Sequence, residues 1–139
     1  MPLRVGDFAV REVPLTAEDI VRYATLCGDT NPLHHDEAAA RKSRFGGLIA
    51  SGAHTIALLT GFCAAFTTSR APCVGLEFSY QLRRAARAGD VLHLRWEVVA
   101  VEASEKLGGD LITLRGELRD QGGALLVGAS GTVLVREGF

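Results

Sequence analysis

The first half of the chain has helical periodicity over residues 16–28. Ile20, Ala24 and Cys27 recur at the spacing of one helix face. Thr16 is a good N-cap, with an acidic residue three positions later, which is typical of a helix start. The pattern therefore predicts an amphipathic helix whose apolar face packs on the core.

A second helical stretch, residues 52–69, is apolar nearly all round. Because it lacks a polar face, we expect it to be covered on all sides. It is shorter than the roughly 20 apolar residues of a membrane-spanning helix, and Pro72 stops it. A short Ala-rich helix with Asp36 as its N-cap is predicted between the two long helices.

Elsewhere the apolar residues recur with a period of two, which predicts strands. The candidate strands are residues 7–14, 74–82, 91–100, 111–119 and 125–136, the last two joined by a turn at 120–123. The expected buried faces are Val74, Leu76, Phe78, Tyr80 and Leu82 in one strand, and Leu92, Leu94, Trp96 and Val98 in the next.

An apolar helix and several antiparallel strands, each with one apolar face, must share a single core. The economical arrangement is a curved antiparallel sheet wrapped around the helix, an α+β fold. The 139 residues contain no repeat, low-complexity segment or linker, so we expect one domain over residues 1–139.

Composition and charge narrow the possible functions. The chain has 47% hydrophobic and 22% charged residues, as in ordinary globular proteins. A formal net charge of -1 and 6% aromatic residues argue against nucleic acid or an anionic membrane as a partner. Three cysteines without a CxxC pair, and no apolar signal segment at the start, predict reduced thiols and a cytoplasmic location.

The stretch with the most candidate catalytic residues is CGDTNPLHHDEAAARKSRFGGLIASGAHT, residues 27–55. Asp29 and His34 flank a turn at Asn31-Pro32, which can fold the carboxylate and the imidazole over one small volume. Such a pair can take a proton from a shared water and return one elsewhere near neutral pH. Gly52, at the expected start of the apolar helix, offers a backbone N–H at the positive end of the helix dipole.

An acid, a base and an oxyanion donor together suit the addition of water next to a thioester carbonyl. Water adds to an α,β-unsaturated acyl group, negative charge develops on the carbonyl oxygen, and the Gly52 N–H stabilises the enolate. Which of Asp29 and His34 first accepts the water proton does not follow from the residues.

The same stretch also resembles a known family. Its pattern Y-x-x-x-C-G-D-T-N-P-L-H-x-D-x-x-x-A is similar to the hydratase signature of the MaoC-like, (R)-specific enoyl-CoA hydratases, which is centred on Gly-Asp-x-Asn-Pro-x-His. GGLIASGAHT resembles the segment leading into their central helix, and RAGDVLHLRWEVV and GTVLVR resemble their later strands.

The resemblance implies a hot-dog fold and a homodimer with a continuous sheet. The implied reaction is the reversible hydration of a trans-2-enoyl thioester, of coenzyme A or acyl carrier protein, to an (R)-3-hydroxyacyl thioester. Asp29 and His34 would be the catalytic pair, and Gly52, Asn31, Ser51 and Ala53 would bind substrate. No metal or redox cofactor is implied, since coenzyme A is part of the substrate.

Two positions depart from the family pattern. Cys27 stands where a serine is usual, and Ala53 stands where a larger residue, often Trp or Met, follows Ser-Gly. One hypothesis is that Ala53 leaves room for a longer or branched acyl chain. The alternative is that core residues such as Phe62 or Phe66 fill the space.

Other polar residues have simpler interpretations. Adjacent side chains on an extended stretch point apart, so His34 and His35 do not predict a metal site. His35 and His54 are expected to be structural. The basic runs at 41–44 and 83–87 are expected to be solvated, and the alternative is that they attract the phosphates of coenzyme A.

Two other functions are open alternatives. A thioesterase on the same fold would need a carboxylate along the central helix, and residues 53–69 contain no Asp or Glu. A non-catalytic acyl-thioester-binding subunit of a heteromeric complex is disfavoured by the intact Asp29/His34 pair. The acyl chain length, the carrier and the physiological direction do not follow from the sequence.

Overall fold

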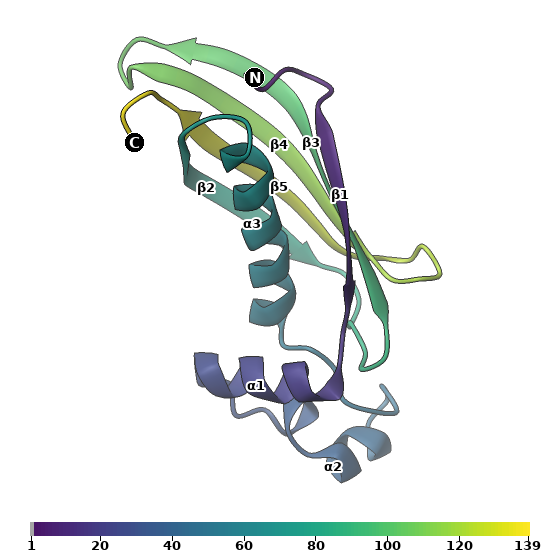
Figure 1. Ribbon diagram of the computed structural model, residues 1–139. Coiled ribbons are helices and arrows are strands. Elements are labelled where there is room, and N and C mark those ends of the chain that lie inside the picture. Colours follow the sequence, from purple (N-terminus) through teal and green to yellow (C-terminus); the bar gives the residue numbers. More distant parts are fainter. Residues whose placement is uncertain (1) are drawn as a thin grey trace.

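The computed structural model describes residues 2–139 and confirms the predicted α+β architecture (Figure 1). The strands are β1 (Phe8–Pro14), β2 (Cys73–Leu82), β3 (Val91–Ser104), β4 (Gly109–Arg119) and β5 (Leu125–Val135). The helices are α1 (Ala17–Cys27), α2 (Glu37–Lys42) and α3 (Gly52–Thr68), with a single 3₁₀ turn, η1 (Pro32–His34).

The five strands form one antiparallel sheet in the order β1-β3-β4-β5-β2. The sheet curves around α3, which runs along its concave face, while α1 and α2 gather near the beginning of α3 (Figure 1). The loop that carries the Asp29–His34 turn lies between α1 and α2, so this arrangement brings it to the start of the central helix.

The core lies between α3 and the middle strands. The predicted face of β3 is buried throughout, as its members Leu92, Leu94, Trp96 and Val98 show. The Trp96 indole N–H donates to the carbonyl oxygen of Leu59 on α3 at 2.8 Å, so the one polar atom of this side chain is satisfied inside the core. This bond ties the sheet to the helix.

Helix α1 begins as predicted and ends one residue before Gly28. The Thr16 hydroxyl accepts the Asp19 N–H at 3.1 Å, and Gly28 adopts a left-handed conformation with φ 79° that ends the helix. Ile20 and Ala24 are buried. The prediction that Cys27 shares their buried face is wrong, because Cys27 is the last residue of the helix and its side chain is exposed.

Strand β2 departs from the predicted alternation. A bulge between Gly75 and Glu77 inserts Leu76 without a partner on β5 and shifts the side chains that precede it. Phe78 and Tyr80 pack against the core, as expected. The prediction that the whole set is buried is wrong, because Val74, Leu76 and Leu82 are 42%, 50% and 55% exposed on this edge strand.

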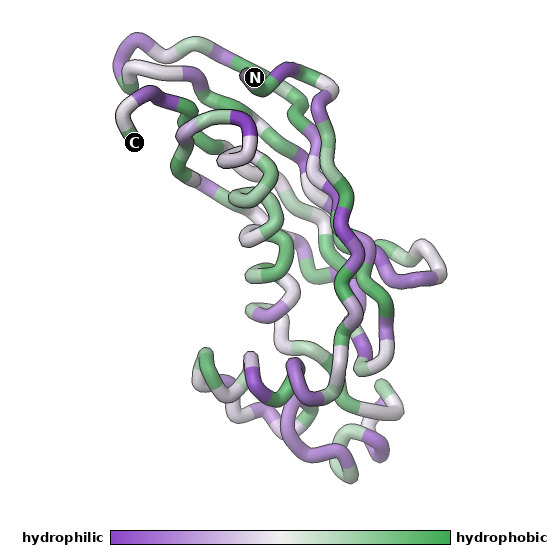
Figure 2. The backbone as a smooth tube through the Cα atoms, in the orientation of Figure 1, coloured by the Kyte–Doolittle hydropathy of each residue, from purple (hydrophilic) through white to green (hydrophobic). Residues whose placement is uncertain are grey.

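The face of α3 turned away from the sheet is also open in the single chain. Figure 2 shows the helix as predominantly apolar along its length. Ala53, Gly61, Ala64 and Ala65 are nevertheless exposed. The prediction that α3 is covered on all sides is therefore wrong for one copy of the chain, since the sheet curves around only one side. Within residues 2–139, no helix is long and apolar enough to cross a membrane.

Candidate active site

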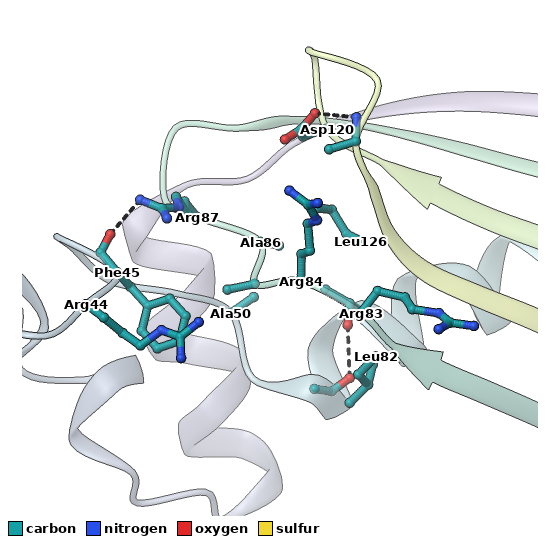
Figure 3. A pocket seen from close by; sticks show the side chains of 14 residues that line it. Arg44, Phe45, Ala50, Leu82, Arg83, Arg84, Ala86, Arg87, Asp120 and Leu126 are labelled. Carbon is teal, nitrogen blue, oxygen red and sulfur yellow. Dashed lines mark hydrogen bonds between the residues drawn. The ribbon is translucent and has the colours of Figure 1, made fainter.

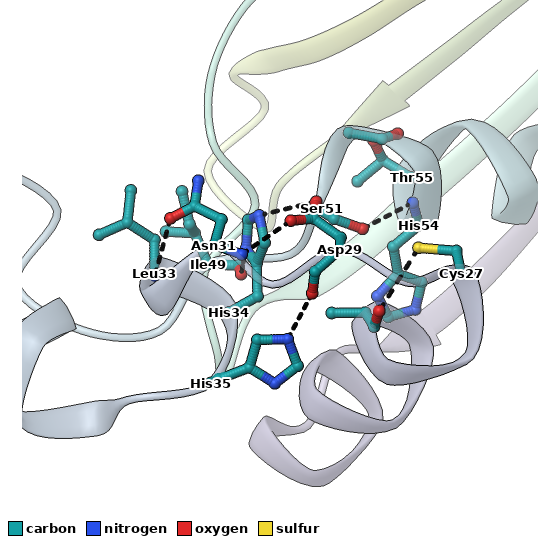
Figure 4. Close-up of polar contacts among 12 residues, drawn as sticks. Cys27, Asp29, Asn31, Leu33, His34, His35, Ile49, Ser51, His54 and Thr55 are labelled. Carbon is teal, nitrogen blue, oxygen red and sulfur yellow. Dashed lines mark hydrogen bonds and ion pairs between the residues drawn. The ribbon is translucent and has the colours of Figure 1, made fainter.

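The turn after α1 holds the Asp29 carboxylate in a defined orientation (Figure 4). Its Oδ1 accepts the backbone N–H of Asn31 at 3.0 Å. The Asn31 side chain in turn accepts the N–H of Leu33 at 3.0 Å and caps η1, which begins at Pro32. This local bonding leaves Oδ2 of Asp29 free to point elsewhere.

Oδ2 of Asp29 points at His34. The distance between Oδ2 and the Nε2 atom of His34 is 3.4 Å, and the His34 side chain is buried whereas that of Asp29 is 36% exposed. Nδ1 of His34 lies 2.7 Å from the carbonyl oxygen of Ile49. A carbonyl oxygen only accepts, so Nδ1 carries a hydrogen and Nε2 of the neutral ring is an acceptor. Two acceptors at this separation can both accept hydrogens from one bound water molecule.

The neighbouring histidine, His35, stabilises the loop. Nε2 of His35 donates to the backbone carbonyl oxygen of Asp29 at 2.5 Å, which ties the two ends of the turn together. His34 and His35 thus bond in different directions. Residues 2–139 contain no group of three or more His, Cys, Asp and Glu side chains placed to share a metal ion.

The start of α3 is built around Ser51 and Gly52. Ser51 is fully buried and is the N-cap, since its hydroxyl accepts the N–H of His54 at 3.2 Å. The Gly52 N–H donates to no acceptor within residues 2–139. A Cβ on Gly52 would lie 2.6 Å from Cδ1 of Leu82, so glycine lets Leu82 pack over the helix start. Ser51 therefore shapes the helix end, and Gly52 presents its N–H there.

His54 is buried beside this helix end. Its ring stacks on Tyr23 of α1, with centroids 4.6 Å apart and planes 9° from parallel. Burial lowers the pKa of His54; the Asp19 carboxylate opposes this shift, and His34 adds to it. Nδ1 of His54 is buried and has no hydrogen-bond partner among residues 2–139. The neutral ring is thus a packing element at the α1–α3 contact.

A cavity of about 750 Å³ opens beside the start of α3 (Figure 3). Gly52 and Thr55 line it, and Asp29, His34 and Ala53 do not. Ala53 is exposed on the single chain, so its expected contact with the acyl group stays a prediction. The remaining lining includes four arginines from the two basic runs, namely Arg44, Arg83, Arg84 and Arg87. Sequence reasoning treated the two runs separately and missed that they meet.

Comparison with known proteins agrees with this architecture. Residues 7–112 match the family model described as MaoC like domain. The chain belongs to the MaoC-like family. It is 29% identical over 126 residues to a 3-hydroxybutyryl-CoA dehydratase of Methylorubrum extorquens, and the match covers 83% of this chain and 78% of that one.

Solved structures of the MaoC-like family have the same fold. The chain is 28% identical to the (R)-hydratase from A. caviae involved in PHA biosynthesis, with a TM-score of 0.84 over 96% of this chain and 97% of that one. A MaoC-like dehydratase from Rhodospirillum rubrum is 29% identical, with a TM-score of 0.77 over 99% of this chain and 96% of that one. The predicted family and its hot-dog fold are confirmed, and the chain belongs to the MaoC-like hydratase/dehydratase family.

Proposed function

We propose that this MaoC-like protein reversibly hydrates a trans-2-enoyl thioester to an (R)-3-hydroxyacyl thioester. The observation that carries the proposal is the geometry of the Asp29–His34 pair. Two acceptors, Oδ2 and Nε2, lie 3.4 Å apart beside a helix start whose Gly52 N–H has no partner among residues 2–139. The (R) configuration follows the similarity to the A. caviae (R)-hydratase.

The reaction begins with a water molecule held by both side chains. It donates one hydrogen to Oδ2 of Asp29 and the other to Nε2 of His34, which directs an oxygen lone pair outward. An imidazole is more basic than a carboxylate, so His34 accepts the proton as the water oxygen bonds to the β-carbon. The hydrogen bond from Nδ1 to the Ile49 carbonyl oxygen stabilises the resulting imidazolium.

Negative charge moves to the thioester oxygen as the new C–O bond forms. The Gly52 N–H, at the positive end of the 17-residue helix α3, donates to that oxygen. His34 then returns the proton to the α-carbon, and the carbonyl reforms. The sum is one water added across the double bond, and the reverse sequence is dehydration. Asn31 and Ser51 support the reaction by holding Asp29 and the helix start.

The proposal is tested by incubating the purified protein with trans-2-enoyl-CoAs of increasing chain length. Loss of the enoyl-thioester absorbance, without release of free thiol, is the expected result. Release of thiol would instead indicate a thioesterase, although α3 carries no Asp or Glu to support that reaction. Saturable binding without turnover of any chain length would indicate a non-catalytic binding subunit. Either outcome would overturn the proposal.

A further inference from the structure

The proposed hydration chemistry does not use the outer face of the sheet, which is turned away from α3 (Figure 1). Side chains of a strand alternate between the two faces, so the residues between Leu94, Trp96 and Val98 of β3, which are buried, point outward. The same alternation holds on β1 and β4. We call six neighbouring residues of this face the outer patch: Phe8 and Val10 of β1, Arg95 and Glu97 of β3, and Arg115 and Glu117 of β4.

Strand register arranges the outer patch as two adjacent rows. The first row is Phe8, Glu97 and Arg115, and the second row is Val10, Arg95 and Glu117. On β1 an apolar residue lies next to an apolar residue, whereas on β3 and β4 an acid lies next to a base. The two rows are therefore complementary to each other, strand by strand.

The charges of the outer patch are ordered and balanced. The Arg95 guanidinium lies 2.6 Å from the Glu97 carboxylate and 4.3 Å from the centroid of the Phe8 ring. Two arginines and two glutamates give a net charge of 2 − 2 = 0. Phe8 and Val10 nevertheless expose 54% and 66% of their surface. A neutral patch with an exposed aromatic ring and arginines suits a protein partner better than a polyanion or a charged membrane.

A hollow opens over the second row of the outer patch. Its volume is about 560 Å³, and its lining includes Val10, Arg95 and Glu117. A partner that fits this hollow has to offer an apolar group at Val10, an acid at Arg95 and a base at Glu117. The first row of a second copy of this chain offers these three groups in this order.

We infer that the outer patch is an interface with a second copy of this chain. The two copies are related by a two-fold axis that lies between the two faces and crosses the strands midway between the rows. Each row then faces the other row of the second copy, so apolar groups meet on β1 and opposite charges meet on β3 and β4. The contacts are Val10 with Phe8, Arg95 with Glu97, and Glu117 with Arg115 of the second copy.

This interface differs from the β2 edge, so both can form in one assembly. A continuous sheet through two β2 edges would have its two-fold axis perpendicular to the sheet, whereas the axis inferred here lies in the plane of the sheet. Two perpendicular two-fold axes close at four copies. The outer face is the convex side of the sheet and curves away from the contact, so the buried area is small (Figure 1). We therefore expect a weak association, with a Kd of about 0.1 mM.

Sedimentation velocity of the purified protein from about 5 to 500 µM, on both sides of this Kd, tests the inference. We expect the mass of the wild type to double over this range. Glu117→Arg and Arg115→Glu each place like charges across the interface, so each variant alone should associate at least about 10-fold more weakly. In an equimolar mixture the two changed residues face each other with opposite charges, so the mass should double again.

Glu105→Arg is the matched control, because Glu105 is exposed in the turn between β3 and β4 and its charge changes by the same amount as in Glu117→Arg. This control should associate as the wild type does. A wild type that keeps one mass up to about 500 µM, or folded variants whose mixture associates no better than each alone, would overturn the inference. Both β4 variants should turn over substrate as the wild type does at micromolar concentration, so a failure of the interface leaves the proposed function intact.

Discussion

Hydrogen bonds to backbone groups fix the orientation of the ionisable side chains in the turn from Asp29 to His35. Oδ1 of Asp29 is held by the Asn31 N–H, Nδ1 of His34 by the Ile49 carbonyl oxygen, and the Asp29 carbonyl oxygen by His35. Each bond fixes one atom and leaves Oδ2 and Nε2 for a water molecule. The side chains proposed to perform the chemistry are thus oriented by bonds to backbone groups and to His35.

Burial of one residue, His54, makes the free energy of unfolding depend on pH. Burial lowers its pKa in the folded protein, so the unfolded chain binds more protons below the unfolded pKa of about 6.5. The free energy of unfolding contributed by His54 is therefore complete above about pH 6.5 and decreases as the pH falls below it. His54→Phe keeps a ring on Tyr23 and removes the titrating nitrogens, so its unfolding free energy should decrease less on acidification.

Urea unfolding at pH 7.5 and 5.5 measures this difference. His93→Gln is a suitable control, because His93 is exposed on β3 and pairs at the surface with Glu12. The same decrease in wild type and His54→Phe would contradict the role assigned to His54 burial.

The Trp96 side chain of β3 links strand β4 to helix α3. Trp96 on β3 lies over Gly116 of β4 and donates to Leu59 of α3. A Cβ on Gly116 would lie 2.8 Å from atoms of the indole ring. The glycine thus allows the indole to lie flat between sheet and helix.

Gly116→Ala should therefore destabilise the protein by about 1–3 kcal/mol, the usual cost of overpacking a core. Gly128→Ala is the matched control on β5, because its Cβ would make an ordinary 3.4 Å contact with the Gln81 side chain. Denaturant unfolding of the three proteins measures both effects. An unfolding free energy of Gly116→Ala equal to that of the control would show that Trp96 moves aside without cost.

The elements were predictable where periodicity and capping act within one segment. Helix α3 and the buried face of β3 follow from their patterns, and Thr16 and Asp36 mark helix starts as expected. The bulge at Leu76 was not predictable, since it depends on pairing with β5. The same reason explains why the sequence did not reveal that the two basic runs line one cavity. Residues 44 and 83–87 meet only through the long-range bridge between Ile49 and Arg87.

The candidate site likewise has one part that was predictable from the sequence and one part that was not. Asp29, Asn31 and His34 belong to one turn, so their proximity was predictable from local rules. The Ile49 carbonyl oxygen that fixes the His34 tautomer comes from a segment 15 residues away and carries no side-chain signal. Backbone acceptors of this kind become visible only in the folded chain.

On the scale of the whole molecule, the edge strand β2 exposes apolar side chains. β2 is an edge strand with Val74, Leu76 and Leu82 exposed, and the open face of α3 carries small residues. An exposed apolar edge strand favours pairing with another strand. Two copies related by a two-fold axis would join their β2 edges into one continuous sheet and bury these side chains.

We therefore predict a homodimer at micromolar concentration in sedimentation velocity. Leu76→Arg, which places a charge in the predicted interface, should shift the equilibrium towards monomer. Val101→Arg, at an exposed apolar position of β3, is the control and should sediment as the wild type does. A wild-type monomer with full hydratase activity would contradict the predicted assembly.

Turnover by variants of the acid–base pair tests the central claim most directly. Asp29→Asn keeps the acceptor for the Asn31 N–H but removes the charge, and His34→Ala removes the base. Asp36→Asn, at the N-cap of α2, is the control for loss of a nearby carboxylate. With an enoyl-CoA substrate, Asp29→Asn and His34→Ala should each lower kcat by about 100-fold or more while thioester binding survives, and the control should stay near the wild type. Near-wild-type rates in both variants, with the fold intact by circular dichroism, would contradict the proposed mechanism.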